Sequence, residues 1–148
     1  MSGAEPLAGV AHRRNELEEA MQAIEREAAA PSASADWSTD LSAAVRQLQT
    51  ALHDHIRHVE APGALLEQIM ETAPRLQRAV EETRNHHAVL AHSVADLLNL
   101  LAVGDKGETT PVAEIRANVI EILNELARHR QDGADLIYEA YDVDIGGY

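Results

Sequence analysis

The sequence predicts an all-α fold: an up-down-up-down four-helix bundle with a short extra helix between helices two and three. Apolar residues recur at steps of three and four along four long segments, and no segment alternates with the period of a strand. The apolar residues are mostly Ala and Leu, and only 3% of the chain is aromatic. Side chains of this size suit close-packed helices better than a β-sandwich. The 148 residues fit a single domain.

The first two helices are expected over residues 6–30 and from Asp36 or Ser38 to the break at Pro62 and Gly63. Pro31 ends the first helix, and residues 31–36 form a small polar loop. The first apolar stripe is interrupted at Arg14; its members are Leu7, Val10, Leu17, Met21 and Ile24. The second stripe consists of Leu41, Val45, Leu48, Leu52, His55 and Val59.

A short helix over residues 64–73 connects to the third long helix, which begins at Pro74 and ends at the turn over residues 104–107. The fourth long helix begins near Thr110 and Pro111, and residues 144–148 are expected to be a flexible tail. The third stripe is Leu76, Val80, Thr83, His87, Leu90, Val94, Leu97 and Leu101. The fourth is Val112, Ile115, Val119, Ile122, Leu126, His129, Gly133, Leu136 and Ala140.

Composition excludes several classes of function. The net charge of −13 argues against nucleic acid, whose phosphates need a basic surface. The absence of cysteine excludes disulfides, Cys-ligated zinc and iron–sulfur clusters. There is no targeting segment and no apolar run of membrane length, so the expected location is the cytoplasm, without a membrane partner. Motifs of hydrolases, kinases and dinucleotide-binding enzymes are missing from the sequence.

Eight histidines are many for this length, and helical projection divides them. Three occupy positions on the apolar stripes: His55, His87 and His129. The other five project away from the stripes and are expected on the surface: His12, His53, His58, His86 and His92.

The three stripe histidines are predicted to lie in one layer. At a rise of about 1.5 Å per residue, His87 is about 24 Å from the end of helix three, and His129 is about 27 Å from the start of helix four. His55 falls at the same level of helix two, and Arg14 at that of helix one. Burying three imidazoles without partners costs several kcal/mol. A metal ion, a metal-free network of polar side chains, or an organic ligand would each satisfy them.

Three segments resemble the hemerythrin-like (HHE cation-binding) family: HIRHVE over residues 55–60, RNHH over residues 84–87 followed by Leu90, and HRQDGAD over residues 129–135. The resemblance covers most of the chain. It implies a non-haem iron centre, di-iron or mononuclear, that binds or senses O₂, peroxide or nitric oxide. A binding or sensing protein is expected rather than an enzyme. His55, His87 and His129 match histidine ligands, and Glu60 and Asp135 (or Asp132) match bridging carboxylates.

The sequence departs from the family pattern at three places. Arg14 and Ala91 stand at two positions where the family has histidine ligands, and Glu60 follows His55 by five residues instead of four. The alternative hypothesis is a metal-free structural or interaction bundle whose core holds an Arg14–His–carboxylate network. A second copy of the chain is a candidate partner, since four apolar residues that the stripes leave unused could form a surface patch: Trp37, Leu98, Leu100 and Ile120.

Overall fold

Four long helices form the body of the molecule in a computed structural model that describes residues 4–105 and 111–142. The long helices are α1 (Ala4–Ala29), α2 (Trp37–Glu60), α4 (Gln77–Asp105) and α5 (Val112–Tyr141). The short helix α3 (Leu65–Thr72) and the 3₁₀ turn η1 (Pro74–Leu76) connect α2 to α4. No helix within the described ranges is both long and apolar enough to cross a bilayer.

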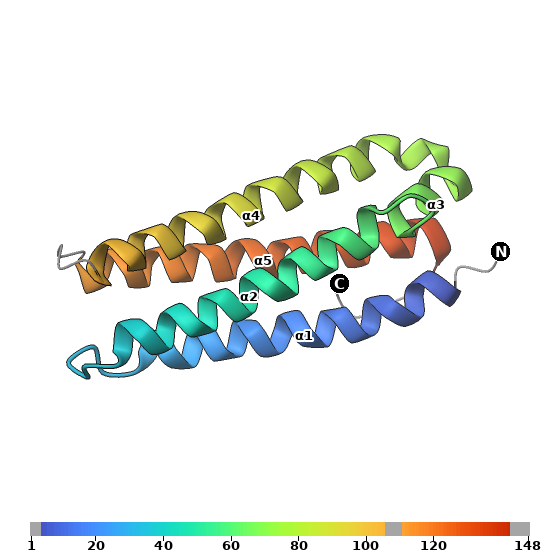
Figure 1. The fold of residues 1–148 in the computed structure, drawn as a ribbon. Coiled ribbons are helices and arrows are strands. Elements are labelled where there is room, and N and C mark those ends of the chain that lie inside the picture. The colour runs from blue at the N-terminus through green and yellow to red at the C-terminus, as the bar shows by residue number, and fades with distance from the viewer. Residues whose placement is uncertain (1–3, 106–110, 143–148) are drawn as a thin grey trace.

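The helices pack in the predicted up-down order. α1 contacts α2, α2 contacts α4, α4 contacts α5, and α5 closes the ring against α1. Figure 1 shows α3 at the end of the bundle where α2 ends and α4 begins. The all-α prediction, the four-helix arrangement and the short connecting helix are therefore confirmed.

Two apolar clusters fill the bundle, and residues of the predicted stripes contribute to both; the smaller one also contains Leu65, Leu66 and Ile69 of α3. The larger cluster runs along α1, α2, α4 and α5 and includes Leu52, Leu90 and Leu126. The smaller cluster lies under α3 and includes Val59, Val80 and Leu136. Ala91, at one of the departures from the family pattern, is half-buried against the larger cluster. The level between the two clusters is where the inward histidines lie.

The helix boundaries follow the sequence signals closely. α1 ends one residue before the predicted boundary, α2 ends just before Pro62, and the segment at Pro74 begins with the η1 turn before α4 continues it. Residues 106–107 of the predicted turn, Thr110 and the tail over residues 144–148 lie outside the described residues, as do the side chains of Leu7 and Val10.

Trp37 is buried, which corrects its assignment to a surface patch. Only 6% of Trp37 is exposed, because its ring packs into the larger cluster beneath the guanidinium of Arg116 at 5.5 Å. The same guanidinium donates hydrogen bonds to the carbonyls of Ala28 and Ala30 at the end of α1. Ile120 does lie on the surface with 59% exposure, whereas Leu98 and Leu100 are half-buried. The proposed patch therefore loses its largest member.

Gly63 gives the turn after α2 its conformation. Its φ is +75°, its N–H donates to the Glu67 carboxylate at 2.8 Å, and its carbonyl accepts from Gln68 at 2.7 Å. A Cβ at this position would meet open space, so backbone strain is the main cost of a side chain. We expect Gly63→Ala to lower the free energy of unfolding by about 1 kcal/mol, measured by urea titration.

Gly63→Asn is the matched control, since Asn tolerates the left-handed region better than Ala. We expect it to lose less stability than Gly63→Ala. Equal stability of Gly63→Ala and the wild type would contradict the assignment of strain to this residue.

Candidate metal centre

Three buried histidines from three different helices converge inside the bundle. His55 of α2, His87 of α4 and His129 of α5 are each 1% exposed, and one potential ligand nitrogen from each lies within 4.8 Å of the other two. The ring centroids are 5.3 Å apart for His55 and His87, 5.5 Å for His55 and His129, and 4.8 Å for His87 and His129. The predicted histidine layer is confirmed, and we call it the histidine cluster.

The histidine cluster occupies the level between the two apolar clusters. Along α2, His55 stands between Leu52 of the larger cluster and Val59 of the smaller one. Along α5, His129 follows Leu126 of the larger cluster and precedes Leu136 of the smaller one. Apolar side chains therefore enclose the imidazoles above and below. A low-dielectric surrounding of this kind strengthens any polar interaction made there and makes an unsatisfied group costly.

Glu60 orients His87. The Nδ1 atom of His87 lies 2.6 Å from Oε2 of Glu60, and Arg84 lies 3.5 Å from the other carboxylate oxygen. A carboxylate only accepts hydrogen bonds, so we infer that Nδ1–H of His87 is the donor. Nε2 of His87 then carries a lone pair, and that atom is buried without a hydrogen-bond partner. The carboxylate thus fixes the tautomer that ligates a metal.

His55 and His129 face each other through their Nε2 atoms, which are 3.4 Å apart. Only one proton fits between two nitrogens at this distance, so at least one of the two atoms presents a lone pair. Together with Nε2 of His87, the cluster therefore has lone pairs on at least two nitrogens that lie within 4.8 Å of one another. This donor pattern suits a transition-metal ion better than an anion.

Burial keeps the cluster uncharged near neutral pH. Desolvation, followed by the nearby His87 and His86, lowers the pKa of His129 to about 3. Desolvation, followed by His86 and Arg84, lowers the pKa of His87 to about 4. Desolvation and the neighbouring His87 and His129 also lower the pKa of His55 well below its usual 6.5. Neutral imidazole is the form that binds metals.

Arg13 of α1, the neighbour of the predicted Arg14, acts on the cluster. The charge of Arg13 contributes to lowering the pKa of His55, and its Nε atom is buried without a hydrogen-bond partner. Residue 13 lies four positions before the buried Leu17, which puts it closer to the inward face than residue 14. Arg14 is half-buried on the same helix.

His86 differs from the other predicted surface histidines. Those four are exposed: His12, His53, His58 and His92. His86 is half-buried, its ring lies 5.4 Å from that of His129, and it lines a hollow next to the cluster. Because His86 directly precedes His87 on α4, its side chain points toward α5 rather than toward solvent. The sequence signal that could have identified His86 is its position directly before the inward His87, on the side of α4 that faces a neighbouring helix.

The predicted carboxylates lie near the cluster at different places. Glu60 is on the α4 side and contacts His87, as described above. Asp135 is exposed and accepts a hydrogen bond from Gln131 at 2.9 Å, and Asp132 is also exposed. Both aspartates line the hollow that His129 and His86 share. Within the described residues, the histidines alone form a group with metal-binding spacing.

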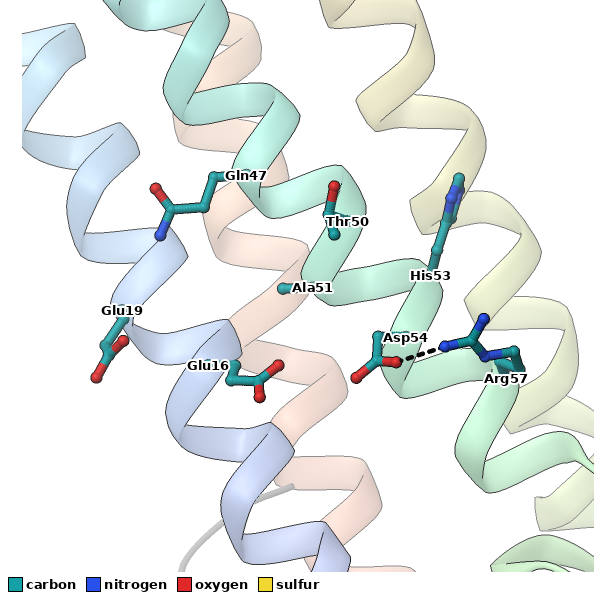
Figure 2. A pocket seen from close by; sticks show the side chains of 8 residues that line it. All are labelled: Glu16, Glu19, Gln47, Thr50, Ala51, His53, Asp54 and Arg57. Carbon is teal, nitrogen blue, oxygen red and sulfur yellow. Dashed lines mark hydrogen bonds and ion pairs between the residues drawn. The ribbon is translucent and has the colours of Figure 1, made fainter.

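A second hollow, of about 690 Å³, lies between α1 and α2 away from the cluster. Figure 2 shows its carboxylates, Glu16, Glu19 and Asp54, and the ion pair that Asp54 makes with Arg57 at 2.8 Å. His53 belongs to its wall, whereas no residue of the histidine cluster does.

Comparisons with family models, curated protein sequences and solved structures found no match. The resemblance to hemerythrin-like proteins therefore depends on the residues of this chain alone. The structure supports its coarser content, which is a helical bundle with three buried histidines that could hold a metal ion.

Removing the carboxylate of Glu60 should weaken metal binding. We expect Glu60→Ala to raise the dissociation constant for Co²⁺ about 10- to 100-fold, because Nδ1 of His87 loses the partner that sets its tautomer and ring orientation. Isothermal titration calorimetry measures the change. Asp54→Ala is the control, since it removes a carboxylate of α2 that contacts Arg57 and His58 only on the surface. Equal affinities of the two variants would contradict the orienting role.

Proposed function

We propose that this chain is a hemerythrin-like metal protein that holds iron at His55, His87 and His129 and binds or senses O₂, peroxide or nitric oxide. The observation that carries the proposal is the convergence of three buried imidazoles from three helices. Nε2 of His87 is buried without a protein partner, and a metal ion would give it one. Helical bundles with inward histidines and carboxylates commonly hold iron.

The donor set fits one ion. Three imidazoles leave coordination positions open, and a small molecule requires such a position to bind. A second ion would need carboxylates such as Glu60 and Asp135 as ligands, and Glu60 already contacts Nδ1 of His87. We therefore propose a mononuclear iron site with Glu60 behind one of its ligands. When bound, the iron supplies the affinity for the diatomic ligand, and the apolar clusters limit access by water.

Anaerobic loading with Fe²⁺ tests both parts of this proposal. We expect one iron per chain by elemental analysis after gel filtration, and an optical change when nitric oxide, O₂ or peroxide is added. His129→Leu should retain no iron, whereas His92→Ala, which changes an exposed histidine of α4, should retain it. Two irons per chain would contradict the mononuclear site. Absence of iron would refute metal binding, and bound iron without any optical response would refute the sensing role.

A metal-free interaction bundle is the second candidate function. The hydrogen bond from His87 to Glu60 and the contact between His55 and His129 satisfy part of the cluster without a metal. Under this alternative the histidines specify the pairing of α2, α4 and α5. The chain would then keep its melting temperature when Fe²⁺, Co²⁺ or Zn²⁺ is added.

A further inference from the structure

An acidic hollow of about 420 Å³ lies between α4 and α5. Its wall contains four carboxylates, two imidazoles and small or apolar side chains. The polar residues that matter here are Glu82, His86, His129, Asp132, Asp135 and Glu139. None of the residues that line it within the described ranges is a lysine or an arginine. We call it the α4–α5 hollow.

The α4–α5 hollow reaches the histidine cluster through His129. His129 is 1% exposed and belongs both to the wall of the hollow and to the cluster. The ring of His86 lies 5.4 Å from that of His129, and the ring of His87 lies 4.8 Å from His129 on the inner side. A series of imidazoles thus leads from the hollow to the buried, unpartnered Nε2 of His87.

A metal ion needs such a path, because solvent reaches only 1% of each cluster histidine. Several carboxylates around one opening raise the local concentration of dications and speed their association. The hollow between α1 and α2 also holds three carboxylates, but Arg57 offsets part of their charge and no cluster residue borders it (Figure 2).

We propose that the α4–α5 hollow is the entry route by which divalent metal ions reach the histidine cluster. The inference rests on the proposed metal-binding function. The carboxylates attract the hydrated ion, His86 is the first imidazole that it meets, and His129 transfers it to the centre. The hollow acts on the rate of loading, while the three histidines set the affinity.

Stopped-flow absorption with Co²⁺ as the probe tests the route at low ionic strength. The variant is Glu82→Gln combined with Glu139→Gln, which removes one exposed carboxylate from each helix at the hollow. We expect association about tenfold slower than in the wild type. Because neither residue belongs to the cluster, dissociation should slow by the same factor and the dissociation constant should stay unchanged. Added salt should slow the wild type more than the variant.

Glu16→Gln combined with Glu19→Gln is the matched control, since it changes the net charge equally at the hollow between α1 and α2. It should load Co²⁺ at nearly the wild-type rate. Equal slowing of both double variants would reveal only an effect of net charge and overturn the route, as would unchanged rates in both. A wild-type chain that binds no Co²⁺ would instead refute the metal-binding function itself.

Discussion

Replacing His87 with Leu should abolish the stabilisation that the wild type gains from added metal. At a free Fe²⁺ concentration 100 times the dissociation constant, a ligand of the folded state adds about 2.7 kcal/mol to the free energy of unfolding. For a chain of this size the melting temperature then rises by about 5–10 °C. His87→Leu removes the imidazole whose Nε2 is buried without a partner, so the rise should disappear. Anaerobic differential scanning calorimetry measures it.

The relevant quantity is the change in melting temperature on adding metal. His87→Leu also alters the stability of the metal-free protein, because Glu60 loses its hydrogen bond to His87. His92→Ala is the control on the same helix, because that histidine is exposed and pairs with Asp96. It should keep the full shift. If His87→Leu responds to Fe²⁺ as strongly as the wild type, the ion binds elsewhere on this acidic chain.

The metal-free protein should lose about 4 kcal/mol of stability between pH 7 and pH 5. The folded-state pKa values of His87 and His129, about 4 and about 3, lie below the unfolded value of 6.5. The unfolded chain therefore binds more protons in this range, and stability falls as the pH decreases. Each of these histidines contributes about 2 kcal/mol at pH 5. His55 acts in the same direction, whereas Glu60, whose pKa burial raises, acts in the opposite one.

Urea unfolding at pH 7 and pH 5, in the presence of a chelator, measures this loss. Between pH 7 and pH 5, the His129→Leu variant should lose about 2 kcal/mol less of its free energy of unfolding than the wild type, because Leu does not titrate. His53→Ala, on the exposed surface of α2, should leave the loss unchanged. Stability that stays constant from pH 7 to pH 5 would contradict the burial of neutral imidazoles.

Most of the fold can be predicted from the sequence, because the side chains that a helix buries recur at steps of three and four residues. The stripes placed His55, His87 and His129 inside, and a constant rise per residue placed them at one level. Both predictions depend only on the geometry of a single helix and on short connections. Pro62 and Gly63 similarly fix the end of α2 without reference to distant residues.

The contacts between helices could not be predicted from the sequence. Glu60 lies 27 positions before His87, and only the packing of α2 against α4 brings the two within 2.6 Å. His86 lies at the border between the inward face of α4 and the face toward solvent, so the packing of α5 against α4 determines how far His86 is buried. Each case depends on a lateral direction that projection of a single helix does not resolve.

Anomalous diffraction from crystals loaded with one equivalent of Fe²⁺ tests the central claim most directly. We predict a single peak at the centre of the histidine cluster, with nitrogen ligands from His55, His87 and His129 at about 2.0–2.2 Å, near the usual distance for imidazole. Glu60 should remain hydrogen-bonded to His87. A peak confined to the α4–α5 hollow or to the surface, with the three imidazoles bonded only to each other and to Glu60, would contradict the account.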